Sequence, residues 1–294
     1  SFSSGVSARA GLRSGPVPAG VFGVGAAVTK PACAEPPSNY SPLKVPGTVV
    51  KDIDGLEAGT NHGRAADKYV YSASVVNQWL EKPSTQPKNK KIVFVTFDDG
   101  PTTKFTGEQL DNLEKAGARA TFFMIPPQMR DVGKNMLSRS LKMGNALAIH
   151  SYSHDYKYLY HGSAANKAKH ISCDWDWAMA QSRAILGSNY FSSAFRYPGG
   201  HMSWTNLSQA DATLAKRGVG WIDWNAMSGD ADAQRPTTVP GYLQMVKKSI
   251  KESNNPNVVV ILNHDTYGKQ MTAKAMPSIL AWLKSQGYEF GVIA

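Results

Sequence analysis

Short apolar runs recur along the chain from about residue 91 onward and predict a series of buried strands. Residues 92–97 are β-branched and aromatic throughout, and residues 120–125 have a similar texture. Runs of this length and composition are typical of strands that are covered on both faces. The same pattern predicts further strands at residues 146–149, 194–196, 219–222, 258–262 and 289–293.

Helical periodicity fills most of the intervals between these runs. Leu110 and Leu113 belong to an apolar stripe with helical spacing, and Gly117 follows as a stop signal. Thr106 and Gln109 have the spacing of a capping box, which would begin this helix at Thr106. The alternation of strands and helices predicts an α/β fold with a parallel sheet, and the length suits a barrel. Other helices are expected at residues 243–251 and 279–285.

The N-terminal part of the chain has a different composition. Residues 1–65 are rich in Gly, Ala, Pro and Ser without a sustained period, which predicts an irregular extension. Residues 66–90 contain Tyr69, Tyr71 and Trp79, so we expect a covering helix and a linker there. The main domain is then expected to span residues 91–294.

The same extension has the order of a signal peptide, although its composition argues against one. Arg9 and Arg13 precede a mild apolar run at residues 17–28, and small residues surround Cys33. Because this run is rich in Gly and Pro, we treat it as part of the extension. No stretch has the eighteen or so apolar residues that a transmembrane helix needs, so no membrane span is expected.

Composition narrows the classes of partner. Hydrophobic residues make up 42% of the 294 residues, and the formal net charge is +10. The cations are scattered except near residues 88–91 and 247–248, so we expect no nucleic-acid partner and favour weak attraction to a polyanionic wall. The two cysteines, Cys33 and Cys173, either form a disulfide or remain free thiols, and no pattern decides between these states.

Two adjacent carboxylates follow the first strand. Asp98 and Asp99 precede Gly100-Pro101, which turns the chain so that both side chains can face one cleft. Adjacent carboxylates at a strand end repel each other and are unfavourable to desolvate, and a divalent cation removes that penalty. Taken alone, the segment also fits a solvated Asp-Asp-Gly-Pro turn.

Two histidines four residues apart follow the strand at residues 146–149. On a helical turn, His150 and His154 would lie on one side and could share a metal ion. Two histidines and one carboxylate form a recurrent catalytic zinc set that leaves positions open for water and substrate. A pair of histidines without metal is the alternative.

Three later segments place polar residues at predicted strand ends. A buried Arg196 needs an anion, for which Asp98 is the simplest candidate, and Gly199-Gly200 lets the backbone approach a ligand closely. His264 follows a strongly apolar strand and could act as an acid or base, with Asp223 to fix its tautomer. Individually, these segments also fit an ordinary turn and a structural histidine.

Taken in order, these motifs resemble those of the polysaccharide deacetylase (NodB-homology) family, carbohydrate esterase family four. The resemblance covers residues 90–294. Its most specific parts are Thr-Phe-Asp-Asp-Gly-Pro from residue 96 and His-Ser-Tyr-Ser-His from residue 150. Arg-Tyr-Pro-Gly-Gly from residue 196, Asp-Trp at 223–224 and Leu-Asn-His at 262–264 support it. Ala146 and Ile149 depart from the Glu and Asn of many members, but neither is a ligand position.

The resemblance implies a distorted (β/α) barrel that binds one divalent metal ion, most often zinc. Asp99, His150 and His154 would be its ligands. The resemblance also implies Asp98 as the general base and His264 as the general acid.

Further roles follow from the same resemblance. Arg196 would orient Asp98, and Asp223 would be the partner of His264. Four residues would bind substrate, through the Gly199 backbone N–H at the oxyanion and through an acetyl pocket: Gly199, Tyr197, Trp224 and Leu262.

The expected function is therefore metal-dependent removal of N-acetyl groups from peptidoglycan amino sugars, with release of acetate. The Arg-Tyr-Pro-Gly-Gly segment resembles the bacterial peptidoglycan branch, and N-acetylglucosamine is favoured over muramic acid. Such an enzyme would be extracellular or associated with the cell wall. The alternatives are a chitin or chitooligosaccharide deacetylase, a metal-binding protein without hydrolysis, and a non-catalytic wall-binding protein that stacks sugars on Trp175, Trp177 and Trp204. The sequence leaves the oligomeric state open.

Overall fold

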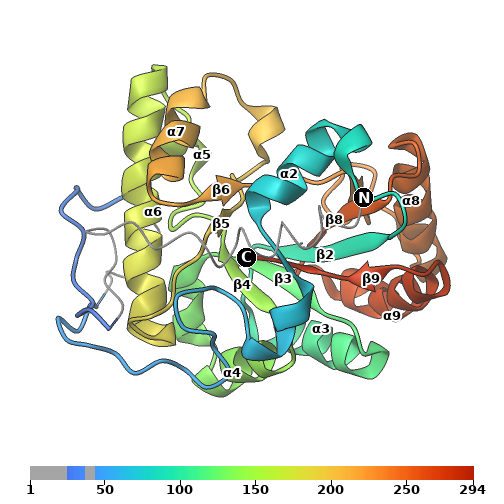
Figure 1. Ribbon diagram of the computed structural model, residues 1–294, viewed down its shortest axis with the longest axis horizontal. Coiled ribbons are helices and arrows are strands. Elements are labelled where there is room, and N and C mark those ends of the chain that lie inside the picture. The colour runs from blue at the N-terminus through green and yellow to red at the C-terminus, as the bar shows by residue number, and fades with distance from the viewer. Residues whose placement is uncertain (1–24, 37–43) are drawn as a thin grey trace.

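The computed structural model describes residues 25–36 and 44–294. The expected signal-like order at Arg9 and Arg13, and most of the apolar run that follows them, lies outside these residues. Within them the chain forms a curled parallel sheet with helices packed around it (Figure 1). The α/β class and the distorted barrel that were expected from the sequence are confirmed.

The main sheet has eight strands in the order β6-β5-β4-β3-β2-β8-β7, and β9 also pairs with β2. Every pairing in this sheet is parallel. A separate parallel pair joins β1 to β10. The strands are β1 (Val70–Tyr71), β2 (Ile92–Asp98), β3 (Ala120–Met124), β4 (Ala146–Ile149), β5 (Ala194–Phe195), β6 (Gly220–Trp221), β7 (Ala226–Met227), β8 (Val258–His264), β9 (Glu289–Phe290) and β10 (Val292–Ile293).

The helices surround this sheet, with α6 and α7 beside one edge and α8 and α9 beside the other (Figure 1). The α-helices are α2 (Ala73–Glu81), α3 (Thr103–Ala116), α4 (Lys134–Lys142), α5 (Tyr156–Leu159), α6 (Ala164–Leu186), α7 (Ser208–Lys216), α8 (Val239–Glu252) and α9 (Gln270–Ser285). The 3₁₀ helices are η1 (Arg64–Tyr69), η2 (Pro83–Thr85), η3 (Pro126–Asp131) and η4 (His201–Ser203).

Side chains of β2 alternate between two hydrophobic clusters, as a strand in the middle of a sheet requires. Val93, Val95 and Phe97 pack with the surrounding helices. Ile92 and Phe94 face the opposite side, in a smaller cluster that also contains residues of α2. Because side-chain direction has a period of two, Asp98 continues the face of Ile92 and Phe94 and points into the barrel.

Helix α2 covers the end of the barrel where the strands begin. Its Val76 and Trp79 are buried against Ile92 of β2 and Val258 of β8. The opposite end, where β2 and β8 finish at Asp98 and His264, is therefore left for chemistry. The division into residues 1–65, 66–90 and 91–294 stays a prediction.

Some element boundaries differ from those expected. Helix α3 begins after Thr102, not at Thr106, because the Thr106 hydroxyl accepts a hydrogen bond from the Thr102 N–H and donates one to Asp265. The predicted strand at residues 289–293 divides at Gly291, where a β-carbon would lie 2.6 Å from the Phe94 ring. No pattern in the sequence predicts β7, which has only two residues.

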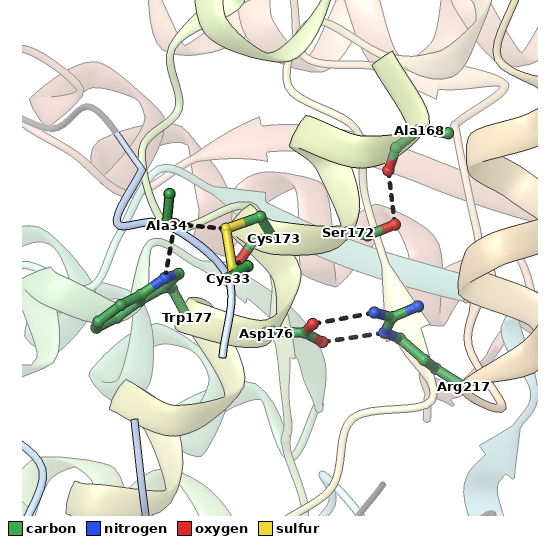
Figure 2. The surroundings of a disulfide bond; sticks show 8 residues. All are labelled: Cys33, Ala34, Ala168, Ser172, Cys173, Asp176, Trp177 and Arg217. Atoms are coloured by element: carbon green, nitrogen blue, oxygen red, sulfur yellow. Dashed lines mark hydrogen bonds and ion pairs between the residues drawn. A yellow bond between two sulfur atoms is a disulfide. The ribbon is translucent and has the colours of Figure 1, made fainter. Parts of the chain in front are cut away.

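A disulfide bond fastens the described N-terminal segment to α6 (Figure 2). Cys33 and Cys173 are paired, with their Cα atoms 5.8 Å apart. Beside the bond, the Trp177 indole N–H donates to the carbonyl of Ala34 at 3.2 Å. The pairing was open at the level of sequence because 140 positions separate the cysteines.

Within residues 25–36 and 44–294, no helix combines the length and the apolar character that crossing a bilayer requires.

Candidate active site

The ends of β2 and β8 bring the base and acid candidates to one place. These strands are parallel neighbours, and their register pairs Asp98 with His264. The Nε2 atom of His264 lies 3.9 Å from the Asp99 carboxylate. Residues that are far apart in the chain therefore meet at the carboxyl end of the sheet, where the chemistry of parallel α/β folds usually lies.

Asp99 lies between two imidazoles. Its Oδ1 atom is 3.3 Å from His150 Nε2 and 3.2 Å from His154 Nε2. One ligand atom from each of these three residues falls within 4.8 Å of the others. The three expected metal ligands are therefore brought together.

The two histidines do not lie on a helical turn, and that expectation was wrong. The segment from His150 to Asp155 is a loop between β4 and α5, in which Ser151 and His154 have left-handed φ angles of 75° and 47°. Neither position is glycine, so both are conformations that the surroundings must enforce. A tight loop, and not helical spacing, brings the rings of His150 and His154 together.

The electrostatics of this triad suit a cation. Burial alone would raise the pKa of Asp99, yet the adjoining His150 and His154 outweigh burial and hold that pKa well below its ordinary value. Within the described part of the chain, the buried Asp99 Oδ1 has no hydrogen-bond partner. An unpaired carboxylate oxygen beside two imidazole nitrogens is a donor set that fits a divalent ion.

The tautomer of His150 is fixed by the backbone. Its Nδ1 atom lies 2.8 Å from the carbonyl oxygen of Arg196. A carbonyl only accepts hydrogen bonds, so Nδ1 carries the proton and donates it. The lone pair of Nε2 is left to face Asp99, as a metal ligand requires.

Arg196 holds Asp98 from inside the barrel. Both side chains are buried, and the guanidinium Nη1 donates to Asp98 Oδ1 at 2.9 Å and to the Thr96 hydroxyl at 2.7 Å. Further donations reach the carbonyl oxygens of Ile222 and Asp223. The expected Arg196–Asp98 pair is present, and its many bonds fix the direction of the carboxylate.

His264 is paired with Asp230 and not with Asp223. Its Nδ1 lies 2.8 Å from Asp230 Oδ1, and its backbone N–H donates to Asp230 Oδ2. Burial alone would lower the pKa of His264, but the bond and the charge of Asp230 raise it to about 9. Thr272 donates to the same carboxylate at 2.8 Å and holds it in place.

The strand order explains why Asp230, and not Asp223, lies beside His264. Strand β7 pairs directly with β8 in the register Met227 to Leu262, so residues just after Met227 lie beside His264. Asp223 follows β6, at the other end of the strand order, and its carboxylate accepts the N–H groups of His201 and Met202. Asp230 follows Ser228-Gly229 in the sequence, but its position beside His264 depends on β7, a strand of only two residues.

The expected substrate residues have different surroundings. The Tyr197 side chain is buried and donates to Asp211 at 2.7 Å, so the expectation that it contacts substrate is not met. Leu262 and Trp224 are partly exposed, and Trp224 packs over the guanidinium of Arg196. At Gly200 a β-carbon would lie 2.7 Å from the Trp224 ring, so this close approach requires glycine.

Aromatic residues flank the Gly199 backbone. A β-carbon at Gly199 would lie 3.2 Å from Trp204 Nε1 and 3.3 Å from the Tyr156 hydroxyl. Tyr156 is exposed, and its ring centroid is 5.6 Å from that of His154. Of the tryptophans considered for sugar stacking, Trp175 and Trp177 are buried in the core and only Trp204 is partly exposed.

The geometry agrees with comparisons to known proteins. The family model described as polysaccharide deacetylase matches residues 85–216. YheN of Bacillus subtilis, named among the polysaccharide deacetylases, is 31% identical over 210 residues, which are 71% of this chain and 69% of YheN. A Bacillus cereus peptidoglycan-N-acetylglucosamine deacetylase is 28% identical, over 69% of each chain.

A solved structure is also similar. A Streptococcus mutans CE4 esterase is 39% identical, with a TM-score of 0.73, over 83% of this chain and all of that one. A bifunctional xylanase/deacetylase from Pseudobutyrivibrio xylanivorans is 30% identical, but the match spans only 31% of its length.

The fold and the site thus define a metal-dependent carbohydrate hydrolase. More narrowly, the chain belongs to the polysaccharide deacetylase family and is an enzyme of that family.

Proposed function

We propose that this enzyme removes N-acetyl groups from the amino sugars of cell-wall peptidoglycan, N-acetylglucosamine foremost, and releases acetate. The observation that carries the proposal is the convergence of Asp98, the Asp99-His150-His154 triad and His264 at one end of the barrel. The Bacillus cereus relative, which is named for this substrate, supports the choice of peptidoglycan.

The triad would hold one divalent ion, and we favour zinc. Two imidazole nitrogens and one carboxylate oxygen are a common protein ligand set of catalytic zinc. Bound there, the ion supplies Lewis acidity, which polarises the acetamide carbonyl and lowers the pKa of water. The proton transfers are left to side chains of the chain itself.

Asp98 is the proposed general base. Arg196 occupies its Oδ1, while its Oδ2 lies on the side of His150, 3.7 Å from Nε2. The carboxylate can therefore accept a proton from the attacking water with its free oxygen, while the guanidinium keeps it oriented. Arg196 acts through Asp98 and is a positioning residue.

His264 is the proposed general acid. An amine leaves readily only when protonated, so a proton must reach the nitrogen as the amide bond breaks. Asp230 bonds to Nδ1 and raises the pKa of His264 to about 9, which keeps the ring protonated at neutral pH, with Nε2 on the side of the Asp99 carboxylate. Asp230, and not Asp223, is therefore its positioning residue.

The acetyl group has a proposed place beside these residues. The Gly199 N–H would donate to the developing oxyanion, and the apolar surfaces of Trp224 and Leu262 would enclose the methyl group. Glycine at 199 and 200 lets the backbone lie close to Trp204 and Trp224. Tyr197 drops out of this set because its side chain is buried.

We further propose that the enzyme works outside the cytoplasm, in contact with the wall. The Cys33–Cys173 disulfide supports this, because such bonds persist mainly in oxidising compartments. The net charge of +10 would favour an anionic wall by weak, salt-sensitive attraction.

The test is acetate release by the zinc-loaded protein from purified, N-acetylated peptidoglycan and, in parallel, from chitin oligomers. We expect release from the wall, together with free amino groups on its glucosamine residues. Activity on oligomers with none on the wall would reverse the order in favour of a chitooligosaccharide deacetylase. If the protein bound zinc but released acetate from neither substrate, it would be a metal-binding protein without this hydrolysis.

A further inference from the structure

A buried carboxylate on α6 faces the loop that carries both histidine ligands. Asp174 is 1% exposed and accepts hydrogen bonds from the backbone N–H groups of Tyr152 at 2.8 Å and Ser153 at 3.0 Å. The Ser153 hydroxyl donates to it at 2.6 Å. Both carboxylate oxygens are thus engaged by residues that lie between His150 and His154.

This loop cannot hold its shape by regular secondary structure. It follows β4 and precedes α5, and the left-handed backbone at Ser151 and His154 is unfavourable for side chains of this kind. Inside the loop, the His154 N–H donates to the Ser151 hydroxyl at 2.9 Å, and the Asp155 N–H donates to the Ser153 hydroxyl at 3.3 Å. From outside the loop, β3 and Arg196 hold His150 through backbone carbonyls, and Asp174 holds residues 152 and 153.

Helix α6 is itself fixed at this point. The preceding residue, Cys173, is bonded to Cys33, and Trp177 one turn further on donates to Ala34 (Figure 2). The Trp177 ring also lies 6.2 Å, centroid to centroid, from the ring of Tyr152 in the ligand loop. Asp174 therefore projects from a rigid segment onto a loop that has no regular structure of its own.

We propose that Asp174 is a positioning residue of the metal centre, which presents His150 and His154 at the spacing that a divalent ion requires. This rests on the proposed function of the triad as a metal site. Asp174 touches neither substrate nor metal ligand rings, and it acts through the backbone of residues 152 and 153. Residues that orient metal ligands from outside typically change metal affinity 10- to 100-fold when they are replaced.

The decisive variant is Asp174→Asn, which keeps the shape of the side chain but has only one acceptor oxygen. Its amide NH₂ must then face a loop donor. The matched control is Asp176→Asn, which lies on the same helix and pairs with Arg217 instead, with both bonds at 2.9 Å (Figure 2). Zinc affinity of the apo proteins is measured by competition with a chromogenic chelator, without any substrate.

We expect Asp174→Asn to bind zinc roughly 10- to 100-fold more weakly, while the control stays within about twofold of the parent protein. Thermal unfolding of the apo proteins, which is blind to metal, checks that the variant is folded. A folded Asp174→Asn protein with unchanged zinc affinity would overturn the proposal.

A second variant decides the matter if Asp174→Asn does not fold. Ser153→Ala removes one donor to Asp174 at a partly buried position, and we expect zinc binding to weaken several-fold; unchanged affinity would overturn the proposal. Failure of the positioning role is distinct from failure of the proposed function. In the first case the parent and variant bind zinc equally, and in the second the parent itself binds no zinc or releases no acetate.

Discussion

Asp98 and Asp99 are adjacent in the chain but have different surroundings, because the backbone changes direction between them. Asp98 is the last residue of β2 and points into the barrel, where Arg196 binds it. Asp99 has a φ of 75°, which turns its side chain toward His150 and His154. A single peptide unit thus separates the carboxylate proposed to accept a proton from the one proposed to bind metal.

The first prediction at the residue scale concerns Asp98. Asp98→Asn removes the carboxylate oxygen proposed to accept the water proton but leaves the three proposed metal ligands untouched, so turnover should fall by a factor of about 10² or more. Zinc stoichiometry should stay at the parental value. Acetate release and metal analysis on the same preparation check both parts, and near-parental turnover would show that the base lies elsewhere.

The second prediction at the residue scale concerns the pH dependence of activity, which follows from the effect of Asp230 on the pKa of His264. As the proposed general acid, His264 must be protonated, so activity should be lost as the pH rises through the pKa of this residue, about 9. Asp230→Asn removes the charge that favours the imidazolium, so the pKa of His264 falls and the alkaline limb of kcat should move down by about one pH unit or more.

The control for this prediction is Asp232→Asn, an exposed carboxylate two residues further along. It should leave the pH profile unchanged. An alkaline limb at the same pH in the parent and Asp230→Asn proteins would mean that His264 is not the proton donor.

At the scale of elements, the turn between β2 and α3 is packed against the residue that follows His264. The carboxyl of Asp265 is buried and accepts a hydrogen bond from the Thr106 hydroxyl at 2.6 Å. The backbone N–H of Asp265 donates to the carbonyl of Asp98. Burial, with Asp98 and Asp99 nearby, raises the pKa of Asp265 to about 7 despite the bond from Thr106. Gly100 fits over this carboxyl only because it lacks a side chain.

We therefore expect Gly100→Ala to be destabilising. Its β-carbon would lie 2.6 Å from the Asp265 oxygens, so the turn or the carboxyl must move, and overpacking of this kind costs about 1–3 kcal/mol. Gly107→Ala is the matched control, because in the middle of α3 a β-carbon meets only Met136 at 3.5 Å and alanine favours helix. Urea unfolding of the zinc-free proteins measures the stability of both variants. Equal unfolding midpoints for Gly100→Ala and the parent protein would refute the close contact between Gly100 and Asp265.

The elements also explain where sequence reasoning failed. The pattern of β2 and β8 was strong enough to place Asp98 and His264 at strand ends. Strand β7 has two residues, too few for any periodic signal, and without it the sequence predicts Asp223, not Asp230, as the partner of His264. The His-x-x-x-His spacing fitted a helix, but left-handed residues in the loop override that period.

At the scale of the whole molecule, the disulfide joins the segment around Cys33 to α6, the helix whose Asp174 binds the loop between His150 and His154. Cys33 and Cys173 are 140 positions apart, and closing so long a loop restricts the unfolded chain. We expect the Cys33→Ser/Cys173→Ser double variant to lose about 2–4 kcal/mol of unfolding free energy. Denaturant titration measures this, and reduction of the parent protein should reproduce the shift. Unchanged stability in both experiments would mean that the bond restricts little in the unfolded chain.

The apolar runs of the sequence predicted the fold class, because they set the strands and parallel strands deliver their end residues to one edge. The resemblance of the motifs predicted the family, the Asp99-His150-His154 set, and the roles of Asp98 and Arg196. Only the tertiary structure decided the pairing of Cys33 with Cys173, the partner of His264, the burial of Tyr197 and the support of the ligand loop by Asp174. Each of these depends on contacts between segments far apart in the chain, and local pattern does not encode which distant segments meet.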